Sequence, residues 1–188
     1  MSTLEVNSIA PLSSSSDVTL GGSSKNIKFA SGTTVDFSTN TPTLTLGADM
    51  KNTPSFRVGR SSAQTISNAT HAVILFDSEQ FDTDNAYDTS NGRFTVPSGK
   101  AGKYFFYGHF RFQSASIFDT AIEIHKNGSQ IVHIEFGANG NYPSCQASYI
   151  GDLAEGDYIQ LTAYQASGSN KDLTGIINYT AFGGFRLT

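Results

Sequence analysis

FDTDNAYDTSNGRFTVPSGKAGKYFFYGHFRF, residues 81–112, is the stretch that decides the fold of this chain. It reads as an acidic, turn-rich loop followed by two strands that a Gly/Pro/Ser turn joins. Along the second strand one face carries Tyr104, Phe106, Phe110 and Phe112, and the other carries Phe105, Tyr107, His109 and Arg111. Because successive side chains of a strand point to opposite faces, we expect this strand to be buried on both sides near its start. A single sandwich needs one apolar face, so the second one predicts a further layer, such as another subunit.

Composition favours an all-β protein. The 188 residues include 18 Gly and 5 Pro, charged residues are few, and no helical stripe is present. The formal net charge is −4 with no block of like charge, which argues against nucleic acid as a ligand. No apolar stretch reaches the roughly 20 residues of a membrane span, so no membrane insertion is expected, and the first residues do not read as a secretory signal. Cys145 is alone, which predicts no intrachain disulfide, folding in a reducing cytoplasm and a buried or idle thiol.

The chain divides into residues 1–54 and residues 55–188. The first region is rich in Ser and Thr, with Phe29 and Phe37 as its only aromatic residues. It contains five short runs in which two apolar residues flank a polar one: Leu4–Val6, Val18–Leu20, Ile27–Phe29, Val35–Phe37 and Leu44–Leu46. These few apolar side chains are too small a core to offset the entropy of ordering the region alone. It is either a disordered tail or, as we favour, a β-stalk or attachment arm that copies or partners order.

Residues 55–188 read as a head domain of about ten short strands joined by turns. The expected strands are Phe56–Val58, Gln64–Ile66, Ala72–Phe76, Arg93–Val96, Lys103–Phe112, Ala121–Lys126, Gln130–Phe136, Cys145–Leu153, Asp157–Tyr164 and Ala181–Leu187. Asn127-Gly128 is a strong signal for a two-residue hairpin turn. Several short strands with regular turns predict a sandwich or jelly roll.

Six motifs in order resemble the globular head of complement component one, subcomponent q, and its tumour-necrosis-factor-like relatives. They are ILFD at 74–77, YDTSNGRFTVP at 87–97, GKYFF at 102–106, HKNG at 125–128, LAEGDYI at 153–159 and FGGFRL at 182–187. The resemblance implies a ten-strand jelly roll that assembles as a homotrimer, with its N- and C-termini together at the trimer base. Independently, the two-faced strand makes Phe105 and Tyr107 the predicted trimer-interface residues.

Residues 1–54 depart from the animal family, because they hold no collagen repeat. MSTLEVNSI at 1–9 and SGTTVDFS at 31–38 are instead similar to N-terminal parts of bacteriophage virion proteins. That resemblance implies a trimeric tail fibre or spike, assembled in the cytoplasm of a bacterial host. Residues 1–54 would attach to other virion proteins, and the head would bind a host surface glycan or protein. A capsid decoration or cement protein is the alternative, and a bacterial surface or secreted lectin-like module is a third.

Two groups of residues raise the question of a metal site. The acidic loop holds Asp77, Glu79, Asp82, Asp84 and Asp88, but an EF-hand pattern fails at Ala86, and a solvated loop is the better interpretation. In a regular hairpin around Asn127-Gly128, Lys126 pairs with Ser129, Ile124 with Ile131 and Ile122 with His133. That register puts His125 and His133 on opposite faces, so no metal site is expected.

Catalysis also lacks a pattern. There is no G-x-S-x-G elbow, Cys145 has no evident paired histidine, and no phosphate loop is complete, so we expect a non-catalytic protein without cofactors. The remaining possibility is that the protein binds a ligand through its loops. Trp is absent, and Tyr142, Tyr164 and Tyr179 lie in or next to Gly/Asn/Ser-rich loops, which makes them candidate receptor-binding residues. The other interpretation is that these tyrosines cap the core with their hydroxyls in water.

Overall fold

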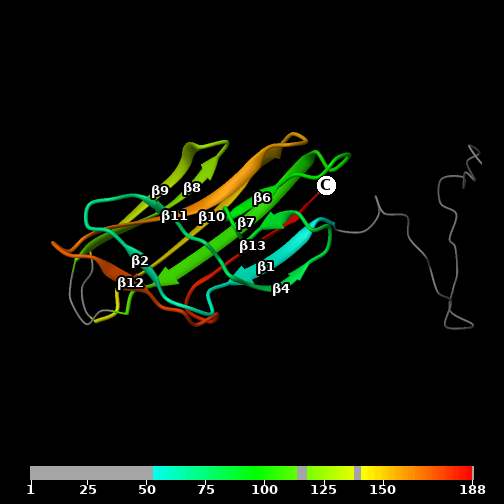
Figure 1. The fold of residues 1–188 in the computed structure, drawn as a ribbon. Coiled ribbons are helices and arrows are strands. Elements are labelled where there is room, and N and C mark those ends of the chain that lie inside the picture. The colour runs from blue at the N-terminus through cyan, green and yellow to red at the C-terminus, as the bar shows by residue number, and fades with distance from the viewer. Residues whose placement is uncertain (1–52, 114–117, 138–140, 188) are drawn as a thin grey trace, which may run out of the picture. The chain divides into compact units, whose positions relative to one another are not determined.

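The computed structural model describes residues 53–113, 118–137 and 141–187, and these residues form a sandwich of antiparallel sheets (Figure 1). All elements of the described ranges are strands, so this part of the chain has no helix that could cross a lipid bilayer. One layer, which we call the β7 sheet, has the strand order β10 (Ser144–Leu153), β7 (Gly102–Arg111), β13 (Ala181–Arg186), β1 (Ser55–Gly59) and β4 (Ser78–Asp82).

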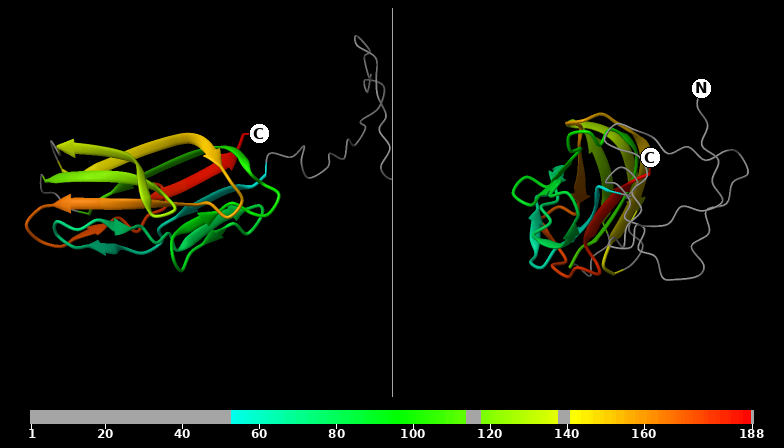
Figure 2. Two further views of the ribbon diagram at one scale, coloured as in Figure 1. Left: turned by 90° about the horizontal axis from the view of Figure 1, so that it is seen from above. Right: turned by 90° about the vertical axis from the view of Figure 1, so that its right-hand side faces the viewer.

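The other layer, which we call the β11 sheet, has six strands. Its order is β5 (Tyr87–Asp88), β6 (Arg93–Thr95), β11 (Tyr158–Ala166), β8 (Asp119–Lys126) and β9 (Ser129–Gly137), and β3 (Ala72–Val73) also pairs with β11. A two-stranded ribbon of β2 (Gln64–Ile66) and β12 (Lys171–Leu173) completes the head. Figure 2 shows the two layers lying face to face. The fold is therefore the predicted all-β jelly-roll sandwich.

The core lies between the two sheets and is dominated by aromatic rings. Phe56, Phe94, Phe106 and Phe182, from both layers, are each exposed by 1% or less. The Phe56 ring stacks on Phe94 at 4.8 Å between centroids and meets the edge of Phe182 at 5.1 Å. Alternation along the strands sends these rings inward, since every second residue of a strand faces the same side. Their packing fixes how the two sheets lie against each other.

All ten predicted strands are present, with small changes of length. The largest is in β3, which ends at Val73 instead of Phe76. Three further strands, β4, β5 and β12, are short and fall in segments that sequence analysis left as loops. Of these, β4 lies inside the acidic loop and pairs with β1 across a register shift.

The two ends of the described chain lie at the same end of the sandwich (Figure 1). Strand β13 pairs with β1 along its length, and the amide of Arg186 donates to the carbonyl of Pro54 at 3.0 Å. This agrees with the neighbouring head termini that the family resemblance implied. Strand β7 begins at this end, which we call the base, and runs to the opposite end.

The predicted register of the β8–β9 hairpin is wrong. Lys126 pairs with Ser129 as expected, but a bulge follows between Ile124 and His125, so Ile124 pairs with Val132 and Glu123 with His133. The extra residue in β9 shifts the remaining pairs by one position, and a one-residue shift moves side chains to the other face. His125 and His133 therefore lie on the same face as Glu123, and the argument that placed them apart does not hold.

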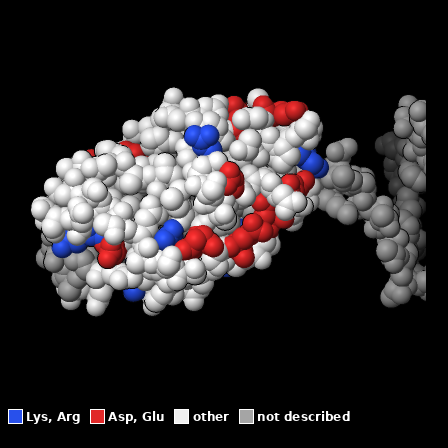
Figure 3. Space-filling view, in the orientation of Figure 1, with Lys and Arg blue, Asp and Glu red and all other residues white. Residues whose placement is uncertain are grey.

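The acidic loop uses its carboxylates to fix its own turns. The amide of Tyr87 donates to Asp82 at 2.7 Å, and Ser90 and Asn91 donate to Asp88. In Figure 3, Asp and Glu side chains gather in a band on one side of the molecular face in view, and Lys and Arg side chains are scattered singly. In the described residues no group of three or more His, Cys, Asp or Glu side chains is arranged to hold a metal ion.

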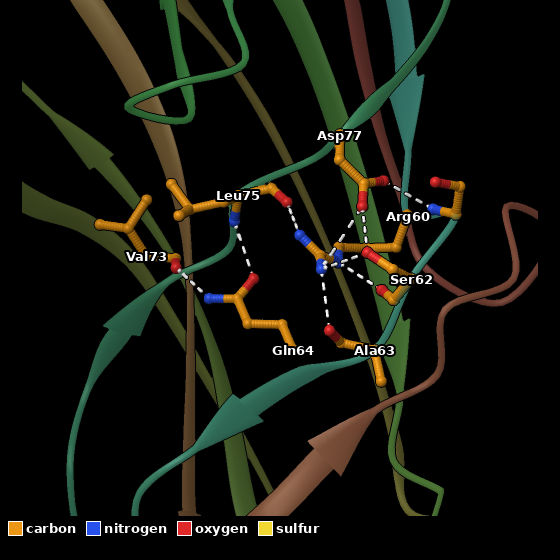
Figure 4. A network of polar contacts seen from close by, with 8 residues as sticks. Arg60, Ser62, Ala63, Gln64, Val73, Leu75 and Asp77 are labelled. Carbon is orange, nitrogen blue, oxygen red and sulfur yellow. Dashed lines mark hydrogen bonds and ion pairs between the residues drawn. The ribbon is translucent and has the colours of Figure 1, made fainter.

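A buried arginine joins the β1–β2 loop to the β3–β4 loop (Figure 4). Arg60 is 6% exposed and donates to the carbonyls of Ser62 at 2.9 Å, Ala63 at 3.0 Å and Leu75. Its guanidinium also lies 3.5 Å from the carboxylate of Asp77. Burial acts to raise the pKa of Asp77, but hydrogen bonds from Ser62 and Ser61 and the charge of Arg60 hold it below its ordinary value. This network holds the β1–β2 and β3–β4 loops in place, because these loops form few backbone hydrogen bonds of their own.

Candidate functional site on the outer face of the β7 sheet

The outer face of the β7 sheet carries most of the residues that sequence analysis singled out. On β7 itself, Tyr104, Phe106 and Phe110 are fully buried in the core. The alternating residues Phe105, Tyr107, His109 and Arg111 point outward and are partly exposed. The predicted division of this strand into two aromatic faces is therefore what the fold displays.

Near the base, this outer face carries a group of apolar side chains beside the exposed ion pair of Lys103 and Asp152. Phe105 lies between Ile150 of β10 and Phe185 of β13 in the strand register, and Ile150 is 64% exposed. The Phe105 ring packs on Phe185 at 5.5 Å and on Tyr107 at 6.3 Å between centroids. Three strands from β7, Phe81 of β4 is 48% exposed, and Arg57 of β1 lies next to it in the register. These five residues, Phe81, Phe105, Tyr107, Ile150 and Phe185, we call the apolar patch.

The patch depends on a glycine in the neighbouring strand. Gly183 lies beside Tyr107 in the register, and a Cβ atom built there would be 2.8 Å from the Tyr107 hydroxyl and 2.9 Å from its Cζ. A side chain at this position would push the tyrosine ring off β13. Gly183 therefore lets Tyr107 lie flat across the sheet, where its ring adds to the patch.

Toward the far end of β7 the same face becomes polar and is centred on Arg111. Its guanidinium carbon lies 3.5 Å from the ring centroid of Tyr179 and 5.2 Å from that of Tyr142. Its Nε donates to the hydroxyl of Thr174 at 3.4 Å, which helps to hold the side chain in place. Both tyrosines are well exposed, at 42% and 50%. We call Arg111 with these two rings the arginine–tyrosine site.

A cavity of about 500 Å³ opens beside Arg111. Besides the guanidinium, its lining combines an imidazole, two side-chain amides and three aromatic rings. These belong to His109, Gln146, Asn178, Phe110, Phe136 and Tyr179, and Ser144 and Cys145 complete the lining. Among the ion pairs of the described ranges none involves Arg111, whereas Arg60 has Asp77 as a partner. A cation between exposed rings, next to amide donors and acceptors, suits a polar ligand that brings its own carboxylate or stacks a sugar ring.

The predicted binding residues thus separate into two places. Tyr142 and Tyr179, 37 residues apart in the chain, meet at Arg111. Tyr164 lies on the β11 sheet, where its ring stacks on His71 at 4.5 Å. Sequence analysis did not single out Arg111 as the residue between the two rings. The signal available for it was only its outward position on β7, next to the aromatic residues.

Cys145 is poorly suited to nucleophilic chemistry. It faces the core from β10 and is 3% exposed. Burial raises the pKa of its thiol to about 12, although a contact with the Thr120 hydroxyl at 3.8 Å acts in the opposite direction. A thiol protonated at neutral pH is a weak nucleophile.

Comparisons with known proteins agree with this architecture. The model of the C1q domain family matches residues 55–187. Among solved structures, murine APRIL at pH 8.5 superposes with a TM-score of 0.53 and 14% identity over 71% of this chain and 98% of that one. The Eiger TNF of S. frugiperda gives 0.54 and 11% over 72% and 94%. The globular domain of zebrafish complement 1qA protein gives 0.49 and 18% over 72% and 98%. No curated protein matches the chain by sequence.

The head is a jelly-roll sandwich of the kind that complement and tumour-necrosis-factor-like proteins share. Since the family model covers more than two thirds of its length, the chain belongs to the C1q domain family.

Proposed function

We propose that this chain is a homotrimeric, non-catalytic attachment protein of a virion, whose C1q-domain head binds a glycan or protein on the surface of a host cell. Assembly uses the apolar patch, ligand binding uses the arginine–tyrosine site, and residues 1–54 join the head to other virion proteins. The observation that carries the proposal is the outer face of the β7 sheet, which carries the apolar patch in its half nearer the base and the arginine–tyrosine site at the far end.

Support for assembly comes from the apolar side chains that one chain leaves in water. Phe81 and Ile150 are 48% and 64% exposed, and Phe105, Tyr107 and Phe185 are only partly covered. Complete burial of one such side chain stabilises by about 1.5–3 kcal/mol, so a partner copy that covers several of them gains a large part of an association free energy. The resemblance to trimeric heads supports two further copies of the same chain as that partner.

Assembly is tested by sedimentation of the full chain. We expect the wild type to sediment as three chains of 20.1 kDa each. Phe105→Asp and Tyr107→Asp place a carboxylate in the contact and should dissociate it, because an unpaired charge in an apolar interface is costly. Leu75→Asp is the matched control, since this leucine is also exposed, at 38%, but lies in the loop between β3 and β4. A monomeric wild type, or trimers of both variants, would show that the patch is not the contact.

Support for ligand binding comes from the position of the arginine–tyrosine site. It lies at the end of β7 opposite the base, where a surface can approach without meeting the residues near position 53. Binding of labelled full-length protein to host cells or to acidic glycans is the assay. We expect Arg111→Ala and Tyr179→Ala to abolish it while the sedimentation behaviour stays that of the wild type. Lys103→Ala removes an exposed cation near the base and should leave binding intact.

The virion assignment is supported by the resemblance of residues 1–54 to bacteriophage virion proteins, and residues 1–52 lie outside the described residues. Antibody-gold labelling of particles in the electron microscope tests it. Label on tail fibres or spikes supports attachment, and label spread over the capsid shell assigns the chain to decoration instead. Particles without label would refute both virion roles.

A further inference from the structure

A buried carboxylate on the outer face of the β11 sheet is surrounded by histidines. The Glu123 side chain is only 3% exposed, and its oxygens contact His125 Nε2 at 2.8 Å, His133 Nδ1 at 2.8 Å and His71 Nδ1 at 3.1 Å. These residues come from β8, from β9 and from the segment just before β3. Among the described residues only histidines form ion pairs with Glu123. The neutralisation of this buried charge therefore depends on imidazole rings, which are cations only when both ring nitrogens carry a proton.

The remaining contacts of the rings decide how many protons the cluster holds. His133 Nε2 faces Glu135 at 3.0 Å, and His125 Nδ1 faces the carbonyl of Gly128 at 3.4 Å. Both rings thus have an acceptor at each nitrogen. A neutral imidazole carries a single N–H, so it can donate to only one of the two. Every contact of His125 and His133 is made only when both rings are doubly protonated and positively charged.

The directions of the pKa shifts agree with this geometry. Hydrogen bonds to Glu135 and Glu123 raise the pKa of His133 above its ordinary value of 6.5. Burial acts to raise the pKa of Glu123, but hydrogen bonds from His125 and His133 hold it below its ordinary value of 4.5. Stability from His133 is therefore present below 6.5 and is lost as the pH rises through its higher folded-state pKa. Stability from Glu123 is present above 4.5 and is lost in stronger acid.

Besides Glu135, this face carries the charged side chains of Asp119, four residues before Glu123 on β8, and of Arg93 on β6, whose register partner is Gln160. Within the described residues neither of them forms an ion pair with Glu123 or with the three histidines. Strand β11 places Gln160, Thr162 and Tyr164 on this face, opposite His125, Glu123 and Ala121 in the register, and the Tyr164 ring stacks on His71. The donor atoms of the cluster do not converge on a metal position within the described part of the head. The contacts between the rings and the carboxylate are therefore hydrogen bonds, with a proton and not a metal ion between the paired atoms.

We propose that Glu123, His71, His125 and His133 form a pH-responsive clasp. In weakly acidic medium the protonated rings fasten the edge strand β9 and the segment before β3 to β8. As the medium becomes alkaline the rings lose protons and their positive charge. His125 and His133 can then each donate to only one of their two acceptors, the buried carboxylate is no longer neutralised, and both attachments loosen. Strand β9 responds most, because it is an edge strand that pairs only with β8. A cavity of about 320 Å³ lies beside the clasp and is lined by Glu135 and Tyr164, among other residues. The charge and the shape of this cavity change when the clasp loosens.

Hydrogen exchange of the full chain, read by mass spectrometry and corrected for the intrinsic pH dependence, tests the clasp at about pH 6 and about pH 8.5. In the wild type we expect protection of peptides from β9 and from residues 67–73 to fall roughly three- to tenfold at the higher pH, because charged hydrogen bonds are lost. Core peptides from β7 should keep their protection. Glu123→Gln should make the β9 response independent of pH.

His71→Asn separates the two attachments and is a mild change, since this side chain is 50% exposed. It should speed exchange of residues 67–73 roughly threefold at the lower pH and leave β9 unchanged. Equal protection of wild-type β9 at both pH values would overturn the clasp. Protection that rises when zinc is added and falls again with a chelator would also overturn it, because the cluster would then hold a metal. Neither result bears on attachment through the β7 sheet.

Discussion

Replacing Arg60 by alanine tests how the loops of the head are held. The substitution removes donors to three backbone carbonyls, those of Ser62, Ala63 and Leu75, and leaves the carboxylate of Asp77 without its cation. Because Arg60 is only 6% exposed, water does not fully replace these partners. Each buried acceptor that is left without its donor costs about 1–3 kcal/mol, whereas Asp77 is 32% exposed and keeps its hydrogen bonds from Ser61 and Ser62. With three carbonyls affected, we expect a total loss of about 3–5 kcal/mol. Arg60→Lys keeps the charge but not the planar fork, so it should recover only part of that loss.

The matched control is the ion pair of Lys103 and Asp152. Their charged atoms are closer, at 2.7 Å, but the side chains are 57% and 74% exposed. Exposed pairs contribute about 0–1 kcal/mol, so Lys103→Ala should change stability very little. The contrast between the two pairs separates burial from distance as the source of the effect.

Urea unfolding followed by tyrosine fluorescence and circular dichroism measures both losses, since the chain has no Trp. All variants are compared at one protein concentration, because the stability of an oligomer depends on it. A loss below about 1 kcal/mol for Arg60→Ala would refute the reasoning, as would an equal loss for Lys103→Ala. Combining Asp77→Asn with Arg60→Ala completes a double-mutant cycle that measures the coupling energy of this pair. That coupling energy should exceed the coupling energy of Lys103 and Asp152.

Three further outcomes follow from the packing and the charges. Gly108→Ala places a Cβ atom 2.6 Å from Leu161 Cδ2, and the overpacking should lower the unfolding free energy by about 1–3 kcal/mol in urea titrations, less in a Leu161→Val background. Cys145 should resist iodoacetamide at neutral pH in the folded head but react with it in urea. The exposed control variant Ser144→Cys should react with iodoacetamide both in the folded head and in urea. Rapid labelling of Cys145 in the folded head would contradict its burial. Hydrogen bonds from Lys126, Asn127 and Ala154 lower the pKa of Asp157 from 3.8 to about 2, so its contribution is present above 3.8 and is lost as the pH falls toward 2. The difference in unfolding free energy between wild type and Asp157→Asn should shrink over that interval, and a difference that stays constant would exclude the linkage.

Much of the fold could be predicted because its signals are local. The alternation in β7, the Asn127-Gly128 turn and the ten apolar runs each depend on neighbouring residues, and all three are confirmed. Strands β4, β5 and β12 were missed because they span two to five residues and lack a clear apolar alternation. Strand β4 forms only because β1 offers an unpaired edge beside it, which is a property of the assembled sheet.

The sites were harder to predict because they join distant segments. Tyr142 and Tyr179 were recognisable as loop residues, but their meeting at Arg111 depends on where β7 ends and on the loop before β13. The histidine cluster was missed for a different reason. Its geometry follows from one extra residue in β9, and the turn sequence next to that bulge is compatible with either register.

The outer faces of the two sheets differ in how far the chain itself covers them. On β8, the outward residues Ala121 and Glu123 are exposed by 2% or less, because side chains of β9, of β11 and of the segment before β3 cover them. On β7, the outward residues Phe105 and Tyr107 stay partly exposed, although their rings pack on each other and Phe105 also packs on Phe185. The chain thus covers the outer face of β8 with its own polar and titratable groups and leaves aromatic surface open on β7. An exposed aromatic patch is typical of an interaction surface, which is why we propose the contact between copies on β7 and the response to pH on the face that the chain covers by itself.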